Sequence, residues 1–348
     1  MVDVLFATNR NPASKKEGWF GERFHADGPM FFRVGAATLD RVSDDMDEAY
    51  KIRSVTVLPE ALGKDGGEVT KLLGSSALLA DLRKRMMKDK RDVVVLIHGF
   101  ANTFANSLQR AAQISQAYLI DPPEGGQPYE PYVVVFSWPS NGRTEPPWEY
   151  HSDRDDAAAS GVAMARFMMR VLDFLSDKGK CEQRIHLVAH SMGNWAFRHA
   201  VQGIIALNEQ ARLPALFTNA FLMAADEDED ALQEDHKLLR LPELARAVHV
   251  YHSRSDQALL ISDTTKFNPD RLGSGGPLSF SGLSNRIVAV DCDEVNATVP
   301  LHANHQYYRL RKEVIDDVRA VLSGRFLPDQ VPRRVVVESG RRYRIPRV

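Results

Sequence analysis

Cysteine is scarce in this sequence, long apolar runs are missing, and neither sign of charge dominates. The two cysteines, Cys181 and Cys292, lie far apart, which argues against a disulfide framework and for reduced, buried thiols. No apolar run approaches the roughly 20 residues that span a bilayer. The first residues also lack a basic segment followed by an apolar core. We therefore expect a cytoplasmic protein without a membrane span.

The balance of charge excludes further classes of partner. The formal net charge is −2, so no overall field attracts nucleic acid or an anionic membrane.

With 348 residues, the chain is long enough for one large domain with additions to it.

Short apolar runs rich in valine and isoleucine alternate with longer amphipathic stretches. The strand candidates are residues 93–97, 133–136, 185–189, 217–223, 248–252 and 287–290, and the helix candidates are residues 103–118, 153–175, 192–207 and 307–322. Several strands are continuously apolar, as expected when helices cover both faces of a sheet. The alternation predicts an α/β fold with a mostly parallel central sheet and helices on both faces.

Both ends of the chain carry further strand candidates. Residues 1–75 contain candidates at 4–8 and 54–58, which we expect to form an antiparallel entrance to the same sheet, so that residues 1–325 make one domain. Residues 326–348 are rich in arginine, and valines 335–337, Ser339-Gly340 and Tyr343 predict a hairpin. Its interleaved apolar residues favour a structural role or a contact between copies of the chain, and hence a homo-oligomer, over binding to nucleic acid.

The most informative segment surrounds Ser191, where a hydrophobic strand is followed directly by a predicted helix. Ala189 and Gly193 flank the serine at two residues' distance on each side. Small residues are needed there, because a nucleophilic serine on a tight strand-to-helix turn leaves no room for larger neighbours. The turn also directs the first N–H groups of the helix toward the reaction centre. We predict that Ser191 is a nucleophile; the alternative is a serine that merely caps the helix.

A second loop, His98-Gly99-Phe100, ends the earlier strand at 93–97. In α/β-hydrolases a His-Gly loop at this point supplies one backbone N–H of the oxyanion hole, and the residue after the nucleophile supplies the other. The predicted donors are therefore Phe100 or Ala101, together with Met192. A simple strand-ending turn is the alternative interpretation.

The order Ser, acid, His on this fold limits the choice of partners. Asp256 follows the predicted strand at 248–252, and His302 and His305 are the histidines beyond it. We prefer Asp256 as the acid and His305 as the base, because His305 directly precedes a predicted helix. Two alternatives stay open: Asp226, in an acidic run after the strand at 217–223, and His302.

Other residues near the predicted site are given lesser roles. Trp138, Trp148 and Tyr150 follow the strand at 133–136, at the sheet edge where ligands bind, and are candidates for contact with substrate. The histidines lack the three converging ligands of a catalytic zinc, so we predict no metal and no cofactor.

Taken together, the chain resembles the α/β-hydrolases catalogued as a domain of unknown function and often labelled esterase or lipase-like. The shared landmarks are Phe6 to Arg10, His98 to Phe100, Phe136 to Ser140, Ala189 to Asn194, Ala225 to Asp228, Ser255 to Leu259 and Asn304 to Tyr307. The resemblance implies that Ser191, Asp256 and His305 form a triad. Two positions depart from the pattern of that family. Ala101 stands where asparagine is usual, and Asn304 stands where glycine usually precedes the histidine.

These features favour a serine hydrolase that acts on a small-molecule carboxylic ester through an acyl-enzyme. An acyltransferase, a thioesterase or an amidase on the same triad is a second hypothesis. The third is a non-catalytic scaffold that binds a ligand or a partner.

Overall fold

The computed structural model describes residues 1–45, 49–58, 73–145, 148–177, 181–209, 211–259, 270–297, 304–325, 331, 334–338 and 340–347. The strands are β1 (Val2–Thr8), β2 (Arg10–Pro12), β3 (Phe20–Phe24), β4 (Arg33–Arg41), β5 (Tyr50–Leu58), β6 (Val93–Ile97), β7 (Tyr132–Ser137), β8 (Ile185–His190), β9 (Phe217–Met223), β10 (Ala245–His252), β11 (Ile287–Asp291), β12 (Val335–Glu338) and β13 (Arg342–Arg344). The helices are α1 (Gly74–Asp89), α2 (Phe104–Ala117), α3 (Trp148–Ala159), α4 (Gly161–Asp177), α5 (Met192–Leu207), α6 (Leu241–Leu244), α8 (Leu272–Gly275), α9 (Asp293–Asn296), α11 (Tyr307–Leu310) and α12 (Lys312–Leu322).

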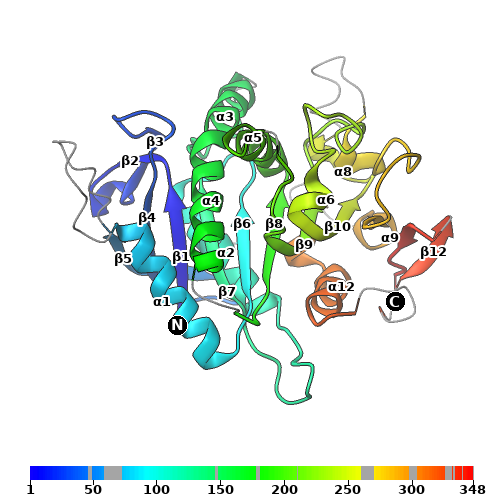
Figure 1. Ribbon diagram of the computed structural model, residues 1–348, viewed down its shortest axis with the longest axis horizontal. Coiled ribbons are helices and arrows are strands. Elements are labelled where there is room, and N and C mark those ends of the chain that lie inside the picture. The colour runs from blue at the N-terminus through cyan, green and yellow to red at the C-terminus, as the bar shows by residue number, and fades with distance from the viewer. Residues whose placement is uncertain are drawn as a thin grey trace.

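One large twisted sheet runs through the molecule, in the order β12-β13-β11-β10-β9-β8-β6-β7-β1-β4-β5 (Figure 1). The neighbours from β13 to β1 are all parallel, and antiparallel pairs occur only at the two edges of the described sheet. The chain moves from β6 to β7 on one side of β6 and then crosses over to β8 on the other. The carboxyl ends of β6 and β8 therefore form a switch point, which is where ligands bind in open α/β sheets.

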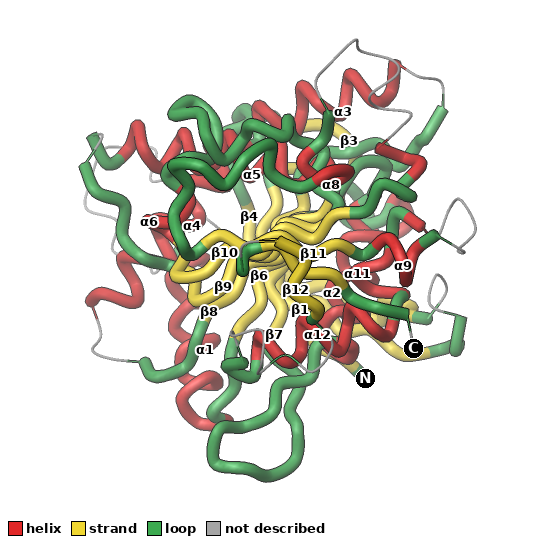
Figure 2. Tube along the Cα trace, turned by 90° about the vertical axis from the view of Figure 1, so that its right-hand side faces the viewer, coloured by secondary structure: helices red, strands yellow, loops and turns green. Residues whose placement is uncertain are grey.

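Two apolar cores cover the two faces of this sheet. Side chains of β6 alternate between them, since Val93, Val95 and Ile97 belong to one core and Val94 and Leu96 to the other. Helices α1, α4 and α5 pack on the first face, while α2, α11 and α12 pack on the second (Figure 2). The predicted α/β architecture with helices on both faces is confirmed.

The six predicted core strands are confirmed as β6 to β11. The expectation of an antiparallel entrance is wrong for β1, which pairs in parallel with β7 and only on its other side antiparallel with β4. Strand β4 and helix α1 were not predicted. For β4 the reason is a sequence rich in small and polar residues.

Two predicted helices are each divided into two. Ser160 separates α3 from α4, and its hydroxyl donates to the carbonyl of Asp156 at 2.7 Å. Gly161 follows, and a Cβ there would lie 2.5 Å from the Cβ of His199. The second helix breaks at Arg311, which has extended backbone between α11 and α12. None of the described helices is both long and apolar enough to cross a bilayer.

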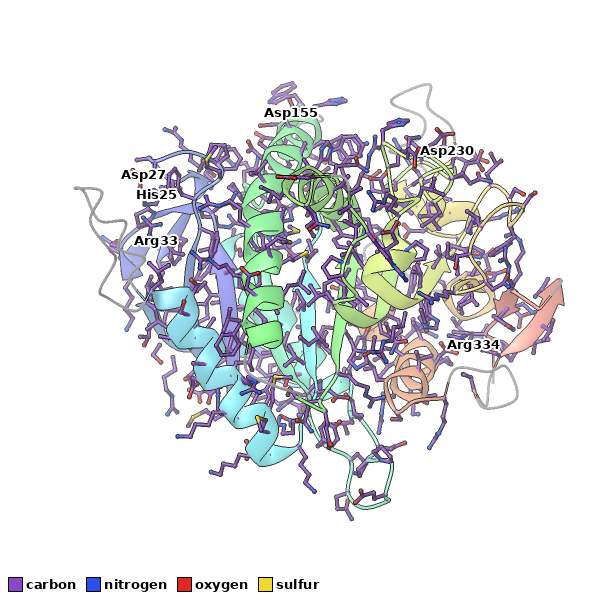
Figure 3. The ribbon with its side chains drawn as sticks, viewed as in Figure 1. His25, Asp27, Arg33, Asp155, Asp230 and Arg334 are labelled. Atoms are coloured by element: carbon purple, nitrogen blue, oxygen red, sulfur yellow. The ribbon has the colours of Figure 1, made fainter. Side chains whose placement is uncertain are left out.

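The carboxyl-terminal hairpin is confirmed and adds β13 in parallel to β11. Its anchor is Arg334, which lies between α12 and β12 (Figure 3). The Arg334 guanidinium donates to both carboxylate oxygens of Asp317 at 2.9 Å and to the hydroxyl of Tyr251 at 3.2 Å. Both members of the ion pair have side chains that are 0% exposed, so the hairpin is joined to α12 by a desolvated charge pair.

Breaking this pair is expected to destabilise the whole fold. Arg334→Met leaves the Asp317 carboxylate buried without its cation, so we expect a loss of about 3–5 kcal/mol in the free energy of unfolding, measured with urea. Arg344→Met is the control, because its partner Glu294 is 39% exposed and surface pairs contribute at most about 1 kcal/mol. Equal losses in the two variants would contradict the anchoring role of Arg334.

Candidate catalytic site

Ser191 is the single residue between the end of β8 and the start of α5. Its backbone has φ 52° and ψ −128°, in a region that residues other than glycine rarely occupy. Its N–H donates to the carbonyl of Met223 in the neighbouring strand at 2.9 Å, which holds the turn in place. A strained serine at the end of a parallel strand is the defining geometry of a nucleophile elbow.

The elbow approaches the loop after β6 so closely that two glycines are required. A Cβ on Gly193 would lie 2.6 Å from the carbonyl oxygens of both Ile97 and His98. A Cβ on Gly99 would lie 2.9 Å from the Cβ of Ser191. The small residue predicted after the serine is therefore needed for backbone packing between the two loops.

The predicted oxyanion donors lie on the two segments that this contact brings together. Met192 is the first residue of α5, and the first N–H groups of a helix have no acceptor within it. In the loop after β6, Ala101 has φ 55°, and its N–H donates to Asp153 Oδ2 at 3.4 Å. The Asn102 amide donates to the carbonyl of Phe100 at 2.8 Å. Because the Ala101 N–H is engaged, Phe100 is the better of the two predicted donors.

The predicted acid and base are paired. His305 Nδ1 lies 2.7 Å from Asp256 Oδ2, and the Asp256 side chain is fully buried. The other carboxylate oxygen accepts the N–H groups of Ala258 at 3.2 Å and Leu259 at 3.4 Å. A carboxylate held in this way fixes the orientation of the imidazole. His302, the alternative base, lies outside the described residues.

His305 lies beside the elbow through its contact with His190. The two rings have centroids 4.8 Å apart, and His190 Nε2 lies 2.9 Å from the carbonyl oxygen of His305. That oxygen only accepts, so His190 Nε2 carries a proton. Burial lowers the pKa of His190 well below 6.5, and the nearby His305 lowers it further. His190 is thus a neutral donor that holds His305 against the strand end.

The pKa of His305 depends on two carboxylates. Burial lowers this pKa, but the charge and hydrogen bond of Asp256, with a contribution from Asp226, outweigh burial and raise it above 6.5. Such an environment stabilises the imidazolium that forms when a histidine accepts a proton.

Asp226, the alternative acid, lies next to the elbow but has other partners. Its N–H donates to the carbonyl of Ser191 at 3.2 Å. Its carboxylate lies 3.6 Å from Arg154 and 3.4 Å from Arg271, and it accepts a hydrogen bond from the hydroxyl of Tyr150. These contacts favour Asp256 as the partner of His305 and give Asp226 a supporting role.

Glu227, Asp228 and Asp230, in the same acidic run, are also paired with cations. Glu227 is fully buried 3.3 Å from Arg198, and burial raises its pKa to about 7. Asp228 lies 2.8 Å from Arg271 and 3.0 Å from Lys237. The run therefore forms an ion-pair network at the carboxyl edge of the sheet.

The three aromatic residues predicted to contact substrate occupy different environments. Trp138 is fully buried, stacks on His98 with ring centroids 4.9 Å apart and donates to its carbonyl at 2.8 Å. This burial makes Trp138 a support beneath the loop and not a wall of a pocket. Trp148 is 68% exposed at the start of α3. Tyr150 packs edge-on against Phe100, with ring centroids 5.5 Å apart, so it contacts the residue that carries one of the predicted oxyanion donors.

Among the residues that the structure describes, no group of three His, Cys, Asp or Glu side chains could hold a metal ion. Sequence reasoning gave no role to Arg10, Asp153 or His190. Arg10 and Asp153 bind the loop after β6, and His190 binds the backbone of His305. A signal for Arg10 was present, because it follows β1 at the same carboxyl edge as the site.

A family model described as an alpha/beta hydrolase of unknown function (DUF900) matches residues 75–325, and the chain belongs to this family. The match confirms the resemblance and supports hydrolase activity in general, without naming a substrate. Comparisons with curated proteins and with solved structures found no match.

The pairing of His305 is testable without an assay of activity. In an NMR titration of histidine side chains, we expect His305 to have a pKa above 6.5 and Asp256→Asn to lower it, because burial then acts with less opposition. His190 is the internal control, since burial keeps it neutral in both proteins. An unchanged pKa of His305 in Asp256→Asn would show that the two side chains are not coupled.

Proposed function

We propose that this member of the alpha/beta hydrolase family is a serine hydrolase that cleaves carboxylic esters through an acyl-enzyme. The observation that carries the proposal is Ser191 with a positive φ of 52°, directly after His190, whose ring contacts a histidine that is paired, at 2.7 Å, with a buried carboxylate. A serine that only caps a helix requires neither this backbone strain nor a nearby pair of histidine and carboxylate.

The first half of the reaction forms the acyl-enzyme. Ser191 Oγ attacks the ester carbonyl carbon while His305 Nε2 takes the hydroxyl proton, and Asp256 stabilises the resulting imidazolium. The negative charge on the carbonyl oxygen is accepted by the N–H groups of Phe100 and Met192. When the tetrahedral intermediate collapses, the C–O bond to the alcohol breaks and His305 returns its proton to the leaving oxygen.

The second half releases the acid. A water molecule gives a proton to His305 and attacks the acyl carbon through the same oxyanion intermediate. The bond to Ser191 Oγ then breaks, and Ser191 recovers its proton from His305. Small esters are the proposed substrates because the nucleophile is almost completely buried.

The nucleophile is tested by labelling. A fluorophosphonate probe is expected to modify the wild type at Ser191, located by mass spectrometry. Ser191→Ala is expected to lose both labelling and about 10⁵- to 10⁶-fold of kcat on short p-nitrophenyl esters. Ser115→Ala removes another buried serine hydroxyl, which donates to Pro131 in the fold, and should keep both properties. A wild type that is neither labelled nor active would instead favour a non-catalytic scaffold.

The choice of acid is tested by two matched amides. Asp256→Asn is expected to lower kcat about 10⁴-fold, because the orienting carboxylate of the base is lost. Asp226→Asn keeps the 2.7 Å pair between His305 and Asp256 and is expected to cost far less in kcat, although it leaves Arg154 and Arg271 with less compensation. The reverse order of the two losses would identify Asp226 as the catalytic acid.

A further inference from the structure

A buried arginine from the start of the chain reaches the loop that carries Phe100. Arg10 is 1% exposed, follows β1 and lies outside the residues 75–325 that the family model matches. Its guanidinium donates only to neutral oxygens in the bonds that follow: Nε to Ser137 Oγ at 3.0 Å, Nη1 to the carbonyls of Ser140 at 2.9 Å and Gly21 at 3.1 Å, and Nη2 to the carbonyl of Asn102 at 2.7 Å.

A second buried side chain binds both this loop and the loop that follows β7. Asp153, from α3, accepts the N–H groups of Ala101 at 3.4 Å and Asn141 at 3.2 Å, and also the hydroxyl of Ser140. The Ser140 oxygen in turn accepts the N–H of Asn102 at 3.0 Å. The carbonyl of Asn102 is thus held by Arg10, and its N–H is held through Ser140 by Asp153.

This double attachment explains how the loop keeps an unfavourable backbone conformation. Ala101 has φ 55°, which an alanine adopts only when its surroundings fix it. The turn at Ala101 leaves the N–H of Phe100 as the donor in the loop. The backbone before it passes so close to the elbow that a Cβ on Gly99 would lie 2.9 Å from Ser191 Cβ. A small shift of the loop would therefore move the donor relative to the reacting carbonyl oxygen.

Burial also destabilises the charged form of Arg10. Burial lowers the pKa of Arg10 to about 9, although the carboxylates of Asp153, Asp156 and Glu22 raise it. The group therefore stays charged at neutral pH. Burial, and after it the charge of Arg10, lower the pKa of His98 to about 3, so the field of this cation reaches the loop. A desolvated cation that binds mainly carbonyl oxygens adds little stability compared with an apolar side chain of similar size.

We propose that Arg10, together with Asp153, is a positioning residue that holds the Phe100 N–H in the oxyanion hole. The amino-terminal strands are then part of the catalytic unit, although they lie outside the matched family region. The proposal rests on the proposed serine-hydrolase function, because it concerns the same oxyanion.

The test separates positioning from stability. Arg10→Lys keeps the charge but loses the planar fork that reaches several oxygens at once, and Asp153→Asn keeps the shape but weakens the bonds to the loop. Each variant is assayed, at a temperature where circular dichroism shows it folded, for kcat and KM on a short p-nitrophenyl ester. The inhibition constant of a trifluoromethyl ketone, whose adduct with Ser191 carries an oxyanion, is measured as well.

We expect kcat to fall about 10²-fold in both variants, as for other small displacements of catalytic groups. KM should stay within about twofold, and the affinity for the ketone should fall by about the same factor as kcat, because only the oxyanion is affected. The matched control is Arg334→Lys, which changes a buried arginine bound to Asp317. It is expected to lose stability but to keep kcat and ketone affinity.

Folded variants with wild-type kcat and ketone affinity would overturn the proposal, as would equal losses in Arg334→Lys. If Arg10→Lys does not fold, Ser140→Ala removes a single link and leaves Arg10 in place, and it must show the same selective loss of kcat. A wild type that is neither labelled at Ser191 nor active on esters would refute the proposed function and this role with it. An active wild type with unaffected variants would refute only the role of Arg10.

Discussion

The close approach of two backbone segments, the elbow at Ser191 and the loop after β6, is the constraint on which the proposed site depends. Gly193 and Gly99 allow this approach, because a Cβ on either would lie within 3 Å of the opposite loop. At this approach, Ser191 has a positive φ of 52°, directly before the start of α5. Parallel pairing of β8 with β6 and β9 provides the rigid frame that maintains this strain.

Several buried charged side chains lie around this contact, and they differ in the kind of partner that each one binds. Asp256 has His305 as its partner and sits where an imidazolium would form, whereas Asp226 and Glu227 are paired with arginines. Arg10 differs from these, because it binds mainly backbone carbonyl oxygens, and it connects the segments that follow β1, β6 and β7, three neighbouring strands at one end of the parallel series. The loop that carries Phe100 lies within residues 75–325, which the family model matches, and it is bound by Arg10, which follows the amino-terminal strand β1.

Local pattern was sufficient to predict the core strands and the turn from strand to helix at Ser191, and the expected chain order pointed to Asp256 and His305, which the structure pairs. The apolar runs of β6 and β8 have few alternatives, and Ser191 with Gly193 is a short motif with a strict steric cause. Partners separated by many residues were not predictable, since Arg10 and Ser140, or Ala101 and Asp153, meet only after the sheet forms. Trp138 was assigned to a pocket because the sequence cannot distinguish an aromatic residue under a loop from one above it. The break at Ser160 depends on Gly161 packing against α5, which is likewise a tertiary contact.

The proposed mechanism requires that Ser191 be a nucleophile and that the N–H groups of Phe100 and Met192 bind the oxyanion. The most direct measurement is a crystal structure of the protein after reaction with a phosphonate, whose P=O oxygen occupies the position of the oxyanion. We expect a covalent bond to Ser191 Oγ and a phosphonyl oxygen about 2.7–3.1 Å from the N atoms of both Phe100 and Met192. A phosphonyl oxygen that points away from these two groups, or an unmodified Ser191, would contradict it.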